Sequence, residues 1–148
     1  MLCNTAAKIG NPDVWNPRIE TVLRDGQAAM VALRDASIAR WFTPSFADAE
    51  PAAVDTVVGM LACTSPQGYA ANCAAVRDAD FREQIASIEL PVLVVCGTQD
   101  AVTTPADGRF MVERIKGAQI IELHAAHLSS VEAGEAFTVP VLAFLTAE

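Results

Sequence analysis

One stretch of the sequence limits the possible folds more than any other: the segment 90–105, LPVLVVCGTQDAVTTP. It is an apolar run rich in β-branched residues, bounded by Pro91 and Gly97 and followed by a loop that carries Asp100. Such a run is typical of a strand that is buried on both faces of a parallel sheet. Asp100 then follows the carboxyl end of the strand, which is where open α/β sheets bind their ligands.

The composition excludes several classes of protein. With 148 residues, 52% of them hydrophobic and 19% charged, the chain is long enough for one domain and too apolar to be disordered. A net charge of −8 without a basic cluster predicts no nucleic-acid partner. No apolar run approaches the ~20 residues of a membrane span, and the first residues lack the features of a signal peptide, so we expect a cytoplasmic protein with no membrane partner.

The four cysteines show no CxxC pair and no zinc-binding spacing. We therefore expect no metal site, and interpret the cysteines as small buried hydrophobic residues.

Residues 1–10 are expected to form the end of a core strand and a loop, and residues 11–87 a block of short helices. Asn11 and Pro12 are typical of a helix start, whereas Pro17 predicts either a kink or a second start at Asn16. Apolar positions at helical spacing predict one amphipathic helix over 27–42. Further helices are expected over 51–63 and from 65 to about 77, and a short segment over 81–88.

Residues 88–148 are expected to form an α/β core in the order strand, loop, helix, strand, loop, helix. The second strand is predicted over 118–123, and its loop carries His124 and His127. Ser129 and Glu132 have the spacing of a capping box for the final helix, in which Pro140 predicts a kink or a restart.

Asp100 and His127 follow the two predicted strands, so both are expected at the same edge of the sheet. An acid that binds one imidazole nitrogen fixes the tautomer and leaves the other nitrogen to take a proton from a nucleophile. On spacing alone, a turn aspartate and a loop histidine without a catalytic role remain an open alternative. His124 is interpreted as a solvated loop residue.

Five segments carry a resemblance to a known family. GTQDAVTTPADGR (97–109) and HLSSVEAGEAF (127–137) resemble the acid and histidine loops of α/β-hydrolases. LCNTAAKIG (2–10), RWFTPSF (40–46) and GYAANCAAVRDAD (68–80) are similar to the second half of the 3-oxoadipate enol-lactonases, a family within that superfamily.

The resemblance implies a partial α/β-hydrolase fold, the carboxyl-terminal part of a parallel sheet with flanking helices, into which an all-helical cap is inserted. It implies that Asp100 is the triad acid and His127 the general base. It further implies hydrolysis of 3-oxoadipate enol-lactone in the β-ketoadipate pathway of aromatic degradation, without a cofactor. The substrate is a small anionic lactone, and the candidates for binding its carboxylate or its ring are Trp15, Arg18, Arg40, Trp41 and Arg77.

The sequence departs from the family at the nucleophile. None of the 148 residues lies in a G-x-S-x-G turn, and a glycine loop for an oxyanion hole is also missing. We therefore expect the chain to begin inside a core strand, to be inactive alone, and to use its apolar sheet edge to pair with a missing amino-terminal half or with itself. A truncated non-catalytic remnant, a half-protein that needs a partner, and another α/β-hydrolase esterase remain alternatives.

Overall fold

The computed structural model describes residues 1–147, which divide into two compact units. The sheet unit comprises residues 1–7, 40–43 and 81 onward, and the helical unit comprises residues 8–39 and 44–80. This division differs from the expected helical block over 11–87 at three places. Residues 8–10 belong to the helical unit, whereas 40–43 and 81–87 belong to the sheet unit.

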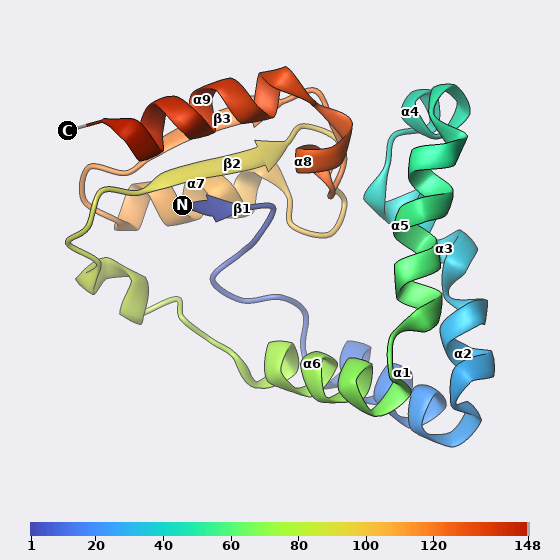
Figure 1. The fold of residues 1–148 in the computed structure, drawn as a ribbon. Helices are drawn as coiled ribbons and strands as arrows, with labels where there is room; N and C mark the ends of the chain where they lie inside the picture. Colours follow the sequence, from blue (N-terminus) through green and yellow to red (C-terminus); the bar gives the residue numbers. More distant parts are fainter. Residues whose placement is uncertain (148) are drawn as a thin grey trace. The chain divides into compact units, whose positions relative to one another are not determined.

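The sheet unit is built on three parallel strands in the order β1 (Leu2–Cys3), β2 (Leu93–Gly97) and β3 (Gln119–Leu123). Within the register, Val94 of β2 pairs with Leu2 on one side and with Ile120 on the other. Both long predicted strands therefore exist and are neighbours. Their carboxyl ends lie at the same edge of the sheet, as Figure 1 shows for the yellow and orange strands.

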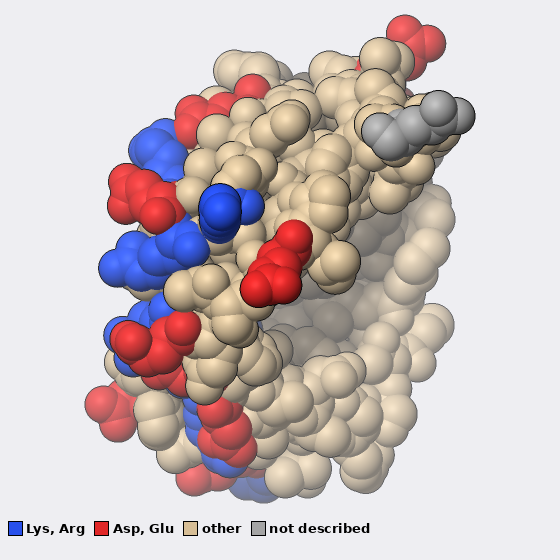
Figure 2. All heavy atoms as spheres, turned by 90° about the vertical axis from the view of Figure 1, so that its left-hand side faces the viewer, with Lys and Arg blue, Asp and Glu red and all other residues tan. Residues whose placement is uncertain are grey.

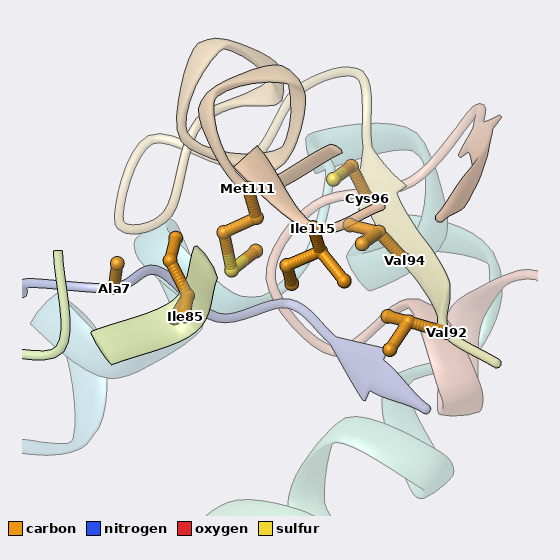
Figure 3. Packing of buried hydrophobic residues seen from close by; sticks show 7 residues of the cluster. All are labelled: Ala7, Ile85, Val92, Val94, Cys96, Met111 and Ile115. Carbon is orange, nitrogen blue, oxygen red and sulfur yellow. The ribbon is translucent and has the colours of Figure 1, made fainter. Parts of the chain in front are cut away.

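Strand β2 is buried along its whole length, as the apolar run predicts. Helices cover both faces of the sheet (Figure 1), and alternate side chains of β2 belong to two different hydrophobic clusters. Val94 and Cys96 pack against Met111 of α7 (Pro105–Arg114) and against Ile115, which directly follows that helix, as Figure 3 shows. On the other face, the cluster formed by the intervening β2 residues includes Val141 of α9 (Glu135–Thr146). Two helices thus sandwich the central strand and fix the position of its carboxyl end.

The helical unit contains short helices whose apolar faces pack together, with α1 packed mainly against α6 and α2. Buried residues such as Val22, Met30 and Val58 form its interior. The helices are α1 (Pro12–Asp25), α2 (Gln27–Ala32), α3 (Arg34–Trp41, which ends in the sheet unit), α4 (Pro44–Ala49), α5 (Pro51–Cys63) and α6 (Pro66–Asp78).

Several boundaries differ from the sequence-based expectation. The predicted helix over 27–42 is two helices, because α2 ends at Ala32 and α3 begins at Arg34, with Leu33 between them. Helix α1 continues through Pro17 and does not restart at Asn16. Cys63 is exposed and Cys3 is only half-buried, so the expectation that all four cysteines are buried is wrong for these two residues.

The carboxyl-terminal helical region also departs from the prediction. A 3-10 turn, η1 (Gln84–Ser87), precedes β2, and the last helix is divided into α8 (Ser129–Glu132) and α9. The division occurs at Gly134, whose φ of 51° favours glycine, and not at Pro140, which lies inside α9. The predicted capping box is wrong, because the cap of α8 is Leu128 and the helix start has no side-chain cap.

The charged side chains give no single-sign surface on the face drawn in Figure 2, where acidic and basic residues alternate wherever they gather. Across residues 1–147, no helix is both long and apolar enough to cross a membrane.

Candidate active site

The acid loop after β2 holds a buried carboxylate. Asp100 is only 3% exposed, and its Oδ1 accepts hydrogen bonds from the backbone N–H groups of Val102 (2.8 Å) and Thr103 (3.0 Å). Its Oδ2 accepts from the Thr103 hydroxyl at 2.8 Å. Residues two and three positions along the chain therefore supply three donors, so the loop itself fixes the orientation of the carboxylate.

The histidine loop after β3 brings His127 to the same carboxylate. His127 Nδ1 donates to Asp100 Oδ2 at 2.9 Å, and the imidazole side chain is 21% exposed. Burial raises the pKa of Asp100, but hydrogen bonds from His127, Thr103 and Val102 outweigh it and lower the pKa to about 2. The ionised acid selects the Nδ1–H tautomer of a neutral imidazole, which leaves Nε2 as the basic nitrogen. The expected meeting of the two side chains is observed.

The two loops are joined by backbone contacts. The N–H of Thr98 donates to the Leu123 carbonyl (2.8 Å), and that of Gln99 donates to the Ala125 carbonyl (3.0 Å). Gly97 permits this approach, since a Cβ at that position would overlap the carbonyl oxygens of Ala125 and Ala126. The glycine of the GTQD motif is therefore required by packing, because the histidine loop crosses directly over it.

Residues distant in sequence anchor the histidine loop. The N–H of Leu128 donates to the Trp41 carbonyl at 2.9 Å. The carboxylate of Glu132 accepts from the Ala126 N–H at 2.9 Å and from both the N–H and the hydroxyl of Thr43. Segment 40–43 is thereby attached to the loop that carries the histidine.

Three residues that bond to the acid and histidine loops were not predicted from the sequence to belong to the site. Ser129 and Glu132 were interpreted as a helix cap, and Asn4 was noted only within a family motif. Asn4 donates to Asp100 Oδ2 at 3.2 Å and accepts from Ser129 Oγ at 2.5 Å. No local sequence signal distinguishes these residues, because only the structure shows that the capping box does not form and that Ser129 and Glu132 bond elsewhere.

Of the predicted substrate-binding residues, Trp15, Arg18 and Arg77 lie in the helical unit. The Arg77 guanidinium is paired with Asp78 (2.7 Å) and also donates to Asn16 (2.8 Å). Arg18, by contrast, lies over the Trp15 ring at 5.3 Å. Burial raises the pKa of the nearby Tyr69 overall, although the charge of Arg18 acts to lower it.

Arg18 also lines a pocket of about 550 Å³ between α1 and α2. Most of the lining is apolar and includes Val22, Ala29 and Leu33, although Asp25 contributes a carboxylate that is paired with Arg24. An arginine in such surroundings suits a small anion that has an apolar part.

Arg40 and Trp41 lie in the sheet unit, at the end of α3. Through its carbonyl, Trp41 is held beside the residue that follows His127. His124 is exposed and pairs with Gln99, which agrees with its interpretation as a loop residue. Within residues 1–147, no group of three His, Cys, Asp or Glu side chains is arranged to hold a metal ion.

Comparison with known proteins places this geometry in a superfamily. The solved structure of the enol-lactonase from Burkholderia xenovorans LB400 superposes with a TM-score of 0.93 and 43% identity, over 98% of this chain and 55% of that one. The chain has the α/β-hydrolase fold. A hydrolase from Pseudomonas aeruginosa PA01 superposes with a TM-score of 0.90 and 40% identity, over 99% of this chain and 54% of that one.

The sequence comparison finds relatives of one named activity over most of the chain. 3-Oxoadipate enol-lactonase 2 of Acinetobacter baylyi is 40% identical over 145 residues, which are 98% of this chain and 53% of that protein. The resemblance to 3-oxoadipate enol-lactonases therefore extends over almost all of the 148 residues. The chain spans about half the length of the curated relatives it matches. No protein-family model matches the chain.

Proposed function

We propose that the chain provides the acid and the general base of a lactone hydrolase, and that the substrate is 3-oxoadipate enol-lactone. The hydrogen bond from His127 Nδ1 to the buried Asp100 carboxylate carries this proposal. In the proposed reaction, Nε2 of His127 removes a proton from a serine hydroxyl as it attacks the lactone carbonyl. The histidine then returns the proton to the leaving enolate oxygen, and in a second step activates water to hydrolyse the acyl-enzyme.

Asp100 has two functions in this scheme. It keeps the Nδ1 proton in place, so that Nε2 faces the nucleophile, and its negative charge stabilises the imidazolium that forms. A pKa of about 2 supports both functions, because the carboxylate stays ionised throughout the range in which a histidine is a useful base.

The nucleophile has to come from residues other than these 148, because the sequence contains no G-x-S-x-G turn. Loss of a triad serine reduces turnover by about a millionfold in a serine protease. We therefore propose that the 148-residue chain alone does not hydrolyse the lactone at a measurable rate.

Recognition of the substrate carboxylate is assigned to arginine, with Arg18 as the first candidate. Its contacts are to Trp15 and Tyr69, and no carboxylate of residues 1–147 is ion-paired with it, whereas Arg77 is engaged by Asp78. Trp41, held next to the histidine loop, is proposed to contact the lactone ring, and its neighbour Arg40 is a second cation for the carboxylate.

The sheet edge is proposed to bind the complementary half of the hydrolase. Strand β1 pairs with β2 on one side only within residues 1–147. Helix α9 also exposes Val139 (63%), Leu142 (55%) and Leu145 (62%). An open strand edge beside apolar side chains favours association, and self-association is the alternative outcome when the complementary half is absent.

A hybrid protein tests the proposed function. The 148 residues are joined to the part of the A. baylyi relative that they do not match, and hydrolysis of the enol-lactone is measured against that of simple esters. We expect lactone hydrolysis by the hybrid, preference for the lactone, and none by the 148 residues alone. Arg18→Gln is expected to raise KM more than it lowers kcat, whereas Arg34→Gln, at the exposed ion pair with Asp55 and outside the pocket lining, serves as control.

Hydrolysis of the esters at the expense of the lactone would contradict the substrate assignment. Measurable hydrolysis by the unjoined chain would contradict the proposal that its nucleophile lies elsewhere.

A further inference from the structure

We propose that Asn4 is a positioning residue of the active site. Its side-chain amide, which Ser129 orients, fixes the position of the acid loop relative to the histidine loop. This inference rests on the proposed function, because Asn4 would affect catalysis only through Asp100 and does not contact the substrate. Neither residue has a role in the helix cap to which the sequence pattern assigned Ser129.

The backbone of Asn4 explains why asparagine suits this position. Its N–H donates to the Val95 carbonyl at 2.9 Å and so extends the pairing of β1 with β2 by one residue. Its φ of 44° then turns the chain out of the strand in the left-handed conformation, which asparagine adopts more readily than most residues with a side chain. The turn places the side-chain amide next to the carboxyl end of β2.

The amide joins three segments of the sheet unit. Nδ2 donates one hydrogen to Asp100 Oδ2 (3.2 Å) and the other to the Ala126 carbonyl (3.3 Å). Oδ1 accepts from the fully buried Ser129 hydroxyl at 2.5 Å. Since the carboxylate and the carbonyl can only accept, the amide nitrogen has to face them, and the serine hydroxyl favours that orientation by donating to the oxygen.

Asn4 is thereby attached to both members of the pair. Asp100 Oδ2 accepts from His127, Thr103 and Asn4, so the amide restrains the same oxygen that holds the imidazole. Ala126, whose carbonyl receives the second amide hydrogen, directly precedes His127. Loss of the amide would release the carboxylate and the histidine loop together, and the His127 Nδ1 proton would become more accessible to water.

Nitrogen-15 NMR of the 148-residue chain with labelled histidine tests this inference, because the only other histidine is the exposed His124. We measure the imidazole tautomer and the rate at which the Nδ1 proton exchanges with water. In the unmodified chain, His127 is expected to be the Nδ1–H tautomer with slow exchange. Asn4→Gly, which keeps the left-handed backbone accessible, is expected to accelerate that exchange about tenfold, as loss of one hydrogen bond to a charged group predicts.

Ser129→Ala keeps the Asn4 amide and removes only the hydroxyl that orients it. We therefore expect a smaller acceleration of the His127 Nδ1 proton exchange than in Asn4→Gly. Ser130→Ala, at the exposed neighbouring serine, is the matched control and should leave His127 unchanged, as should His124 in every variant. Unchanged tautomer and exchange in both Asn4→Gly and Ser129→Ala would overturn the inference, and so would an equal effect of Ser130→Ala. The measurement detects the pair without any lactone hydrolysis, so its failure is distinct from failure of the proposed function.

Discussion

The acid loop and the histidine loop are held in different ways. Asp100 receives three of its hydrogen bonds from Val102 and Thr103, which follow it directly in the chain. The histidine loop is instead attached to segments far away in sequence, through Trp41, Thr43 and Asn4. One half of the pair is therefore organised by its own loop, and the other half depends on the assembled sheet unit.

This difference implies a difference in robustness. A loop that supplies its own donors keeps its geometry when distant parts of the fold loosen. The histidine loop loses its anchors when those distant parts loosen, because the anchors come from Asn4, which follows β1, and from segment 40–43. We expect perturbations of the sheet unit to displace His127 before they displace Asp100.

The largest effect is expected where the two loops touch. Gly97→Ala places a Cβ against the carbonyl oxygens of Ala125 and Ala126 and should separate the loops, which destabilises the chain by about 3 kcal/mol as a severe overpacking. Urea unfolding measures the change. Gly59→Ala in α5 is the control, because nothing lies within 4 Å of its Cβ position and alanine should be neutral or slightly stabilising there. Equal stability of the two variants would show that the loops are not in contact.

The second effect concerns the charge of Asp100. Its folded-state pKa of about 2 lies below that of an unperturbed aspartate, which is about 3.9, so the ionised acid stabilises the fold by about 2 kcal/mol above pH 4. This stabilisation decreases as the pH falls from about 4 to about 2. Urea unfolding at a series of pH values should show the decrease in the unmodified chain and a flatter profile in Asp100→Asn. Identical profiles would mean that the carboxylate is not held as described.

The third effect tests the distant anchors. Glu132→Gln keeps the shape of the side chain but replaces the charged carboxylate, which accepts hydrogen bonds from Ala126 and Thr43, with a neutral amide. This change should lower the free energy of unfolding by about 1.5 kcal/mol. Amide hydrogen exchange should increase in the histidine loop and remain unchanged in the acid loop. Glu113→Gln, at an exposed position of α7, is the control. Faster amide exchange in the acid loop alone would contradict the conclusion that the histidine loop is the one that depends on distant anchors.

The smallest effect concerns one local donor. Thr103→Val keeps the volume and removes the hydroxyl that donates to Asp100 Oδ2, which should destabilise the chain by about 1 kcal/mol. Because that hydroxyl helps to lower the pKa of Asp100, the acid-induced loss of stability should begin at a higher pH than in the unmodified chain. Thr98→Val, at an exposed position of the same loop, should leave the acid profile where it is.

The sequence predicted what is local in this structure. The buried strand, the helix after Thr104 and the loop around Asp100 follow from residues adjacent in the chain, and so does the meeting of Asp100 with His127 at one sheet edge. The interruption of the helix over 27–42 at Leu33 was not predicted, because no proline marks it and Gly26 lies before α2.

The anchors of the histidine loop were not predictable from local patterns. Ser129 and Glu132 have the spacing of a capping box, and only the tertiary contacts with Asn4, Ala126 and Thr43 show that their oxygens are used elsewhere. Pro140 is a similar case, since α9 continues through it while the flexible backbone of Gly134 divides the helices.

Labelling by a serine-directed fluorophosphonate tests the central claim most directly, because it requires an activated serine but no particular substrate. The 148-residue chain alone should not be labelled. The hybrid with the unmatched part of the A. baylyi relative should be labelled at a single serine outside these residues. In the hybrid, His127→Ala should abolish labelling, and Asp100→Asn should slow it by a factor on the order of 10⁴, as the wrong tautomer does in a serine protease. Labelling of the chain alone would contradict the proposal that its nucleophile lies elsewhere, and undiminished labelling of the His127→Ala hybrid would contradict the assignment of His127 as the base that Asp100 orients.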